Sequence, residues 1–509
     1  MADRLFTSNR TDEILSTLRL DTKLEKVVLS RIAFALSINR IGNRVPESNN
    51  FSGGELKRPT FVGENELFLR TIISFVYGSS EYSEDEFFSN HSIIKNHIDY
   101  GASLLYEIYQ EVNKNPDLLL SKLSKEVNFS EKRKDFSKNL NLFVGKTIID
   151  NNDVTIEINN TKKHANSHLA IMGKPGVGKT QMLLKMLTDI RLSTHFQTNF
   201  IYFDYKGDVI DNSRFIELAR VQPFRLLKGG QRLPINPFVL SSYDEQAINV
   251  SAREKAQSFA SINNKLGVVQ RGKLSDAIRK AYNNRRNKQL PFPDFDEVLS
   301  ITLDLYEAEG RKEDSLIEVL KDLANFDLFW KHGNDIPPID KVSSHTFLVD
   351  LHNMPVLKEL VVYLVIERLY KEMASMPDSP IKDDRRVIRT ILVIDEAHNY
   401  LSQNNLFLER IIREGRSKGI VVFFASQSPS DYSQDFFNFQ ELLEFALVFQ
   451  SEGVTAASIQ KILGCNIQTA RELQTEIARL EPWQVIMRGK KQSEEFIKFK
   501  AESFYQSYN

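Results

Sequence analysis

Short apolar runs and amphipathic stretches divide the chain into two regions of different fold class. Residues 1–116 carry apolar positions at helical spacing, for example in LEKVVLSRIAFALSI and HIDYGASLLYEIYQEV. This pattern predicts a small all-α domain. Residues 117–141 follow, and they are polar, rich in lysine and poor in large apolar side chains. Such a composition is typical of an exposed linker.

From residue 142 to residue 509, short β-rich runs alternate with longer helical patterns. The runs are HLAIMG, NFIYFDYKG, HTFLVDL, TILVIDEA, IVVFFASQ and FALVFQ. Strands that are apolar at nearly every position are buried on both faces, as in a mostly parallel sheet covered by helices. We therefore predict an α/β domain over residues 142–509, with a basic helical insert at about residues 245–335.

The first predicted strand leads directly into GKPGVGKT, and a helical run follows it. This matches G-x-x-x-x-G-K-[ST], in which backbone N–H groups surround a phosphate, the lysine reaches the β and γ phosphates, and the hydroxyl binds Mg²⁺. The context of strand, loop and helix makes the motif a strong indication of a nucleotide site, for which we expect ATP with Mg²⁺. The predicted nucleotide-binding residues are Gly173, Lys174, Pro175, Gly176, Val177, Gly178, Lys179, Thr180 and Gln181.

The run TILVIDEA places two carboxylates at the end of a buried strand. Asp395 is the predicted metal ligand together with Thr180, and Glu396 is predicted to polarise the attacking water. The letters D-E-A-H also name a class of RNA helicases, but any P-loop ATPase needs an Asp-Glu pair here. The remaining chain holds no second RecA-like lobe, so His398 is interpreted as incidental.

Several runs in order resemble the HerA and FtsK branch of RecA-like P-loop ATPases, which are hexameric DNA pumps. They are NSHLAI before the P-loop, FDYKGD, LPINPF, the Asp-Glu strand, REGRSKG and ASQSP. The resemblance implies that Arg416, and less directly Arg413, is an arginine finger that reaches the γ phosphate bound by the adjacent subunit. It also implies that Gln427 senses that phosphate. Alternatives are an arginine interacting with a helix dipole and a plain polar strand end.

Asp204 and Asp208 lie at the end of the second strand of this domain. That position is near the expected nucleotide, so either carboxylate is a candidate to assist the water. The alternative is that they cap a loop.

Residues 4 to about 110 resemble another family, DndE, a small helical protein of DNA phosphorothioation systems. The resemblance rests on the RLFTS opening, the SRIA helix, the TFVGE turn and the HIDYGASLL helix. It implies DNA binding through surface lysines, although ordinary surface charge is an alternative explanation. The candidates are Lys23, Lys26, Arg31, Lys57 and Arg58.

Composition limits where DNA could bind. The formal net charge is −1, so binding depends on local basic surfaces rather than on a global field. The most basic internal stretch is RGKLSDAIRKAYNNRRNK, which could contact phosphates or form a solvated helix face on an inserted segment. MRGKKQ lies near the end; in relatives a basic residue near this point helps the nucleotide site, and a surface turn explains it equally well. The basic residues concerned are Arg279, Lys280, Arg285, Arg286, Lys288, Arg488, Lys490 and Lys491.

Cysteine usage and hydropathy indicate a compartment. A single cysteine, Cys465, excludes an internal disulfide framework and suits a reducing cytoplasm. No uncharged apolar run approaches the ~18 residues that span a bilayer. We expect a soluble cytoplasmic protein that does not enter the membrane.

These observations predict an ATP-dependent DNA translocase that acts as a homo-hexamer on double-stranded DNA. The DndE-like region would connect it to an anti-phage defence or DNA-modification system. The alternatives are a conjugation or secretion motor and a regulatory scaffold ATPase that gates a partner. The sequence contains no nuclease constellation, so any cleavage would fall to a partner protein.

Overall fold

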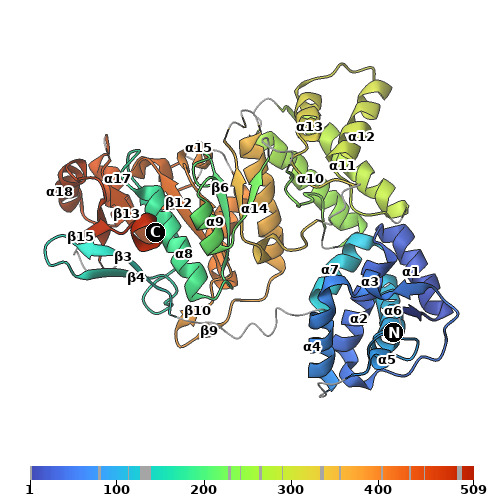
Figure 1. Cartoon of the computed structure of the whole chain (residues 1–509). Coiled ribbons are helices and arrows are strands. Elements are labelled where there is room, and N and C mark those ends of the chain that lie inside the picture. Colours follow the sequence, from blue (N-terminus) through green and yellow to red (C-terminus); the bar gives the residue numbers. More distant parts are fainter. Residues whose placement is uncertain are drawn as a thin grey trace. The chain divides into compact units, whose positions relative to one another are not determined.

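The structure is a computed structural model. It describes residues 3–77, 82–112, 114–126, 139–226, 231–240, 242–262, 266–288, 290–332, 338–352, 354, 357–402, 405–434, 437–451, 453–489 and 496–508. The chain divides into two compact units (Figure 1). The first comprises Met1–Lys132, Val239–Ile248 and Lys280–Pro293, and the second comprises Arg133–Phe238, Asn249–Arg279 and Asp294–Asn509. Two short parts of the predicted insert therefore group with the N-terminal unit.

The N-terminal unit is mainly helical, as its sequence pattern predicts. Its longest helices, α2 and α6, lie against each other so closely that a Cβ on Gly101 would stand 1.9 Å from the carbonyl oxygen of Ala33. The elements of this unit are β1 (Arg4–Phe6), α1 (Asn9–Thr22), α2 (Lys26–Ile41), η1 (Gly42–Arg44), β2 (Glu55–Lys57), α3 (Arg58–Phe61), η2 (Gly63–Asn65), α4 (Glu66–Tyr77), α5 (Glu84–Phe87), α6 (Ile93–Glu111) and α7 (Pro116–Glu126).

Helix α7 corrects the predicted linker over residues 117–141. Leu119 and Leu123 of this helix are buried in the core that α1, α2 and α6 form. Their spacing of four residues places both leucines on one helix face, so this face packs into the core. Residues 127–138 of the predicted linker lie outside the described residues.

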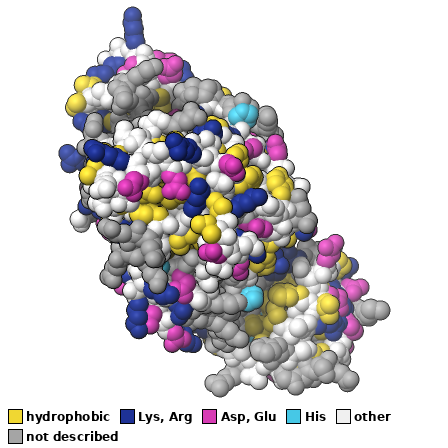
Figure 2. Space-filling model, turned by 90° about the vertical axis from the view of Figure 1, so that its left-hand side faces the viewer, with side chains coloured by type: hydrophobic (Ala, Val, Ile, Leu, Met, Phe, Trp, Pro, Cys, Tyr) yellow, Lys and Arg dark blue, Asp and Glu magenta, His cyan; other side chains and the backbone are white. Residues whose placement is uncertain are grey.

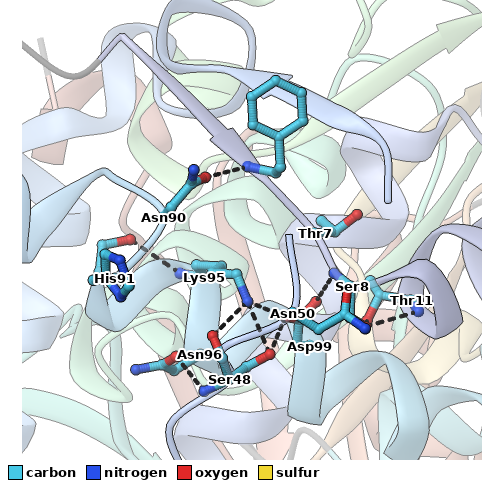
Figure 3. Close-up of polar contacts among 12 residues, drawn as sticks. Thr7, Ser8, Thr11, Ser48, Asn50, Asn90, His91, Lys95, Asn96 and Asp99 are labelled. Carbon is cyan, nitrogen blue, oxygen red and sulfur yellow. Dashed lines mark hydrogen bonds and ion pairs between the residues drawn. The ribbon is translucent and has the colours of Figure 1, made fainter. Parts of the chain in front are cut away.

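A buried polar network ties three segments of the N-terminal unit together (Figure 3). The Lys95 side chain is fully buried, and its Nζ donates to the Oγ and the carbonyl oxygen of Ser48 at 2.8 Å and to Asp99 Oδ2 at 2.6 Å. The Asp99 carboxylate also accepts from the Ser8 backbone N–H at 3.0 Å. A charge without its partner would be costly at this depth.

Replacing Lys95 by Met is expected to destabilise the protein by about 3–5 kcal/mol, because it leaves Asp99 buried without its counter-ion. Lys26→Met is the control, since Lys26 and Asp12 form a pair whose side chains are 37% and 32% exposed. Such a pair contributes less than about 1 kcal/mol. Denaturant titrations followed by circular dichroism measure both losses. Equal losses for the two variants would contradict a buried ion pair at Lys95.

The second unit is built on one sheet that confirms the predicted mostly parallel arrangement. Among the described residues it has eleven strands in the order β4-β3-β15-β14-β13-β5-β12-β11-β6-β8-β7. The block from β13 to β7 is parallel, whereas β14, β15, β3 and β4 extend it in antiparallel order. The strands are β3 (Asn141–Thr147), β4 (Asp153–Glu157), β5 (Leu169–Met172), β6 (Asn199–Asp204), β7 (Gln222–Arg225), β8 (Phe347–Asp350), β11 (Thr390–Ile394), β12 (Ile420–Ser426), β13 (Phe445–Phe449), β14 (Gln484–Arg488) and β15 (Phe496–Ala501).

Helices cover both faces of this sheet (Figure 1). The crossovers through α8 and α9 run toward β7, whereas those through α14 and α16 run back toward β5. Because such crossovers are right-handed, the two pairs lie on opposite faces. The other elements are α8 (Lys179–Ser193), α9 (Ser213–Ala219), α10 (Glu245–Ile262), α11 (Val268–Asn287), α12 (Phe295–Ala308), α13 (Ser315–Asn325), η3 (Val342–Ser344), α14 (Lys358–Ser375), β9 (Ile381–Lys382), β10 (Arg385–Arg386), α15 (His398–Leu401), α16 (Leu406–Lys418), η4 (Pro429–Tyr432), η5 (Phe439–Leu442), α17 (Ala456–Leu463), α18 (Ile467–Ala478) and α19 (Phe504–Tyr508).

A buried histidine joins the sheet to α16. The His168 ring is fully buried; Nε2 lies 2.9 Å from the Ile412 carbonyl oxygen, and the Val422 N–H donates to Nδ1 at 3.0 Å. One ring nitrogen donates and the other accepts, which requires the neutral ring. Burial, only partly offset by the Ile412 carbonyl, lowers the pKa of His168 from 6.5 to about 4.

His168 is therefore expected to cost the protein stability in mild acid. Because the folded-state pKa of His168 lies below its unfolded value, protonation favours the unfolded chain, and its contribution to stability is lost as pH falls from 6.5 toward 4. Linkage gives a loss of about 2 kcal/mol from this group between pH 7 and pH 5. Urea titrations at both pH values compare the native protein with His168→Gln, because the other titrating groups are common to both. Between these pH values the stability of the native protein should change less favourably than that of the variant, by about that amount. The same change in both proteins would exclude a contribution from His168.

Candidate nucleotide site

The predicted site residues converge at one edge of the sheet. The P-loop follows β5, Asp395 and Glu396 follow β11, and Gln427 follows β12. These strands are parallel, with Ile394 opposite Phe424 of β12 and Phe203 of β6. Their carboxyl ends therefore meet at the same edge, where ligands of open α/β sheets bind.

The P-loop has the shape of a phosphate site. Gly176 and Gly178 have φ values of +82° and +111°, which side chains with a Cβ rarely adopt. A Cβ on Gly176 would meet no atom within 4 Å, so the loop faces open space there. Lys179 is 5% exposed, and its Nζ donates to the carbonyl oxygens of Gly173 at 2.5 Å and Lys174 at 3.0 Å. These features fit a bound polyphosphate.

Asp395 has the environment of a metal ligand. It is 1% exposed; Tyr202 donates to its Oδ2 at 3.1 Å and the Glu396 N–H donates to its Oδ1 at 2.9 Å. Burial and the adjacent Glu396 charge raise the pKa of Asp395 to about 7. A cation relieves both effects, so Asp395 and the Thr180 hydroxyl are the residues that would hold Mg²⁺.

Glu396 lies at the centre of a set of polar contacts, in a left-handed conformation with φ +48°. Its Oε1 forms an ion pair with Lys206, and its Oε2 accepts from Gln427 Nε2 at 3.0 Å. Burial alone would raise the pKa of Glu396, but Lys206 and Gln427 hold it below its ordinary value. The carboxylate is therefore charged and positioned, as a general base requires.

The structure adds a neighbour to one residue and decides between two alternatives for another. The Nδ1 of His398, interpreted from the sequence as incidental, lies 3.3 Å from Glu396 Oε2. Asp204 is fully buried, and its carboxylate accepts from the backbone N–H groups of Lys206, Gly207, Val209 and Ile210 at 2.8–3.2 Å. With both oxygens occupied by the loop that follows β6, Asp204 caps that loop rather than assisting a water.

The two candidate arginine fingers lie at the opposite edge of the sheet. Arg413 and Arg416 belong to the last turns of α16, which ends immediately before β12 begins. The length of β12, roughly 20 Å, separates this edge from Gln427. Arg413 also stacks on the Phe437 ring at 4.9 Å. Neither arginine is placed to reach the nucleotide of its own chain.

A pocket of ≈ 320 Å³ adjoins the P-loop, and several of its lining residues had no predicted role. Among them are Lys206, which lies within the run FDYKGD, and Trp483 and Tyr505, which lie outside every run that carried a resemblance. The backbone N–H of Trp483 donates to the Val177 carbonyl oxygen at 3.1 Å, and a Cβ on Gly178 would lie 2.6 Å from the Trp483 ring. The indole therefore lies directly against the P-loop.

Many of the basic residues proposed to contact DNA have protein partners. In the N-terminal unit, Lys26 pairs with Asp12, Arg58 pairs with Glu66 and Glu84, and the Arg31 guanidinium donates to the carbonyl oxygens of Thr60 and Phe61. Lys23 and Lys57 remain exposed. The side chains of Lys26, Arg31 and Arg58 are therefore engaged in contacts within the protein.

The basic stretch on α11 also contains both paired and exposed side chains. Arg279 pairs with Asp276, whereas Lys280 and Lys288 are exposed. Arg488 donates to the carbonyl oxygens of Leu463 and Gly464, and Lys490 and Lys491 lie outside the described residues. On the face shown in Figure 2, basic side chains are interspersed with acidic ones rather than gathered in one block.

Two family models match parts of the chain. Residues 4–112 match the DNA sulphur modification protein DndE. Residues 155–219 match the DNA-binding domain of type IV secretion-system coupling proteins. No curated protein matches the chain. Within the described residues, no helix is long and apolar enough to cross a membrane.

Two solved structures show similarity to much of the chain. VirB4 of Thermoanaerobacter pseudethanolicus superposes with a TM-score of 0.55 at 16% identity, over 72% of this chain and 98% of VirB4. The plasmid coupling protein TrwB, solved with ADP and Mg²⁺, is 12% identical with a TM-score of 0.43, over 66% of this chain and 85% of TrwB. The chain therefore joins an N-terminal region that matches the DndE family model to a domain that carries a P-loop and has the fold of VirB4.

Proposed function

We propose that this protein is an ATP-driven motor that moves double-stranded DNA. The observation that carries the proposal is the convergence of the P-loop, Asp395, Glu396 and Gln427 at one sheet edge, with Glu396 charged and held by two side chains. In a site of this composition, Lys179 binds the β and γ phosphates and Glu396 takes the proton of the attacking water. Bound Mg²⁺ supplies positive charge to the phosphate oxygens.

We propose further that the active unit is a homo-hexameric ring. Arg416 and Arg413 lie at the sheet edge away from the P-loop of their own chain. An arginine in this place can serve a nucleotide only when another copy presents its site to it. Contacts of this head-to-tail kind close into rings, and the channel of a ring can hold a polymer such as DNA.

The DndE match supports a role in DNA modification or anti-phage defence, in the cytoplasm. DndE is described as a DNA sulphur modification protein, so the N-terminal domain is the proposed adaptor to DNA or to a partner, including a nuclease. The family match at residues 155–219 favours a second candidate, a conjugation or secretion motor, because that family belongs to type IV secretion-system coupling proteins.

One experiment tests the motor directly. The ATPase rate is measured alone and with intact double-stranded, nicked and single-stranded DNA of equal length. A motor that grips duplex DNA is expected to be stimulated by the duplex, and the stimulation should weaken at high salt because phosphate contacts are screened. Equal rates in all four conditions would reject the motor and favour a regulatory scaffold ATPase.

Lys179→Ala tests the nucleotide site. Losing a charge-assisted contact to the phosphates is expected to weaken ATP binding by about 10- to 100-fold. The chain has two tryptophans, and Trp483 lines the pocket, so the Trp330→Phe protein carries one reporter at the site. ATP should change its fluorescence, and Lys179→Ala should shift the titration to higher ATP concentrations. An unshifted titration would mean that the loop does not bind the phosphates.

A further inference from the structure

The loop that follows β6 holds Lys206 in a fixed place. The buried Asp204 carboxylate anchors the loop through the N–H groups on both sides of Gly207. Gly207 has φ +77°, and a Cβ there would stand 2.7 Å from His352 Cβ. The backbone of this turn is therefore closely packed at Gly207. The backbone that carries Lys206 is thus rigid, while its four-carbon side chain can move.

The Lys206 ammonium lies between two anionic positions. On one side it forms an ion pair with Glu396, whose side chain is 4% exposed. On the other side, Lys206 lines the same pocket as Gly176, Lys179 and Thr180 of the P-loop. Lys206 itself is 42% exposed, which leaves it room to turn from the carboxylate toward the pocket.

Charge favours an anion at this place. Lys179 and Lys206 line the same pocket, so it carries two like positive charges. A phosphate between them would offset the repulsion of these charges. A terminal phosphate carries more negative charge than one carboxylate, so it competes with Glu396 for the Lys206 ammonium.

We propose that Lys206 senses the terminal phosphate of the bound nucleotide and, by leaving Glu396 for that phosphate, frees one carboxylate oxygen to receive the attacking water. Gln427 keeps the other oxygen in place at 3.0 Å. Lys206 is thereby a positioning residue that couples the water-activating group to the presence of a triphosphate. The inference rests on the proposed ATPase function and adds a residue and a trigger to it.

The test uses the Glu396→Gln protein. In this protein residue 396 carries no charge, so replacing Lys206 does not leave an unpaired carboxylate beside the phosphate. ATP is also hydrolysed slowly, which allows its binding to be measured. Affinities for ATP and ADP are measured by calorimetry with the full chain, with and without Lys206→Met. The second replacement is expected to weaken ATP binding at least ~10-fold and to change ADP binding less than ~2-fold, because ADP lacks the terminal phosphate.

Two further variants exclude a structural effect. Lys206→Arg keeps the charge and should restore most of the ATP affinity in the same background. Lys162→Met removes an exposed lysine of the same unit, whose side chain is 76% exposed, and should change neither affinity. Equal loss of ATP and ADP binding, or ATP binding unaffected by Lys206→Met, would overturn the proposal. If Glu396→Gln itself binds no ATP, the proposed function fails first.

Discussion

Replacing Arg416 by Ala is expected to lower ATP hydrolysis by ~10³-fold while ATP binding stays within a few-fold of the native value. The reason is geometric, because Arg416 lies at the sheet edge opposite to the P-loop of its own chain. The variant therefore keeps every group that binds its own nucleotide. It lacks only the charge that would stabilise the transition state in the neighbouring site.

The measurement is steady-state ATPase activity together with ATP affinity. Arg410→Ala is a matched control, because Arg410 lies on the same helix and stacks on the Tyr370 ring at 5.5 Å. This control should retain most of the activity. If Arg416→Ala hydrolyses ATP at the native rate, or if it no longer binds ATP, the role across an interface is excluded.

Glu396→Gln is expected to reduce hydrolysis by at least ~100-fold with ATP still bound, since a positioned general base is lost. The amide keeps the size of the side chain, but it carries no charge to pair with Lys206 and is too weak a base to take a proton from water. Single-turnover assays with saturating ATP separate this chemical step from binding. Glu472→Gln, an exposed position on α18, is the control. Near-native turnover in Glu396→Gln would remove Glu396 from the role of the base.

The parallel part of the sheet and the phosphate loop could be predicted from the sequence because each is encoded locally. Runs such as IVVFFAS are apolar at nearly every position, and the P-loop glycines adopt conformations that only glycine takes easily. The strand ends then bring Asp395 and Gln427 to the same edge by topology alone.

The features that could not be predicted from the sequence depend on contacts between residues far apart in the chain. Helix α7 leads into a lysine-rich segment, and the burial of Leu119 and Leu123 shows that it belongs to the core. Lys206 pairs with a carboxylate far along the chain, and Trp483 meets the P-loop through the antiparallel strands beside β13. No local sequence pattern predicts either contact.

If two copies of the chain build each active site, mixing two inactive variants should restore activity. Arg416→Ala and Glu396→Gln proteins are combined, mixed assemblies are verified by mass spectrometry, and ATP hydrolysis is measured. A mixed interface can combine an intact Glu396 from one chain with an intact Arg416 from the next, whereas neither pure variant has a complete site. Hydrolysis above the sum of the two pure variants is expected. Mixed assemblies that stay inactive, while native monomers hydrolyse ATP at the full rate, would exclude a site shared between two copies.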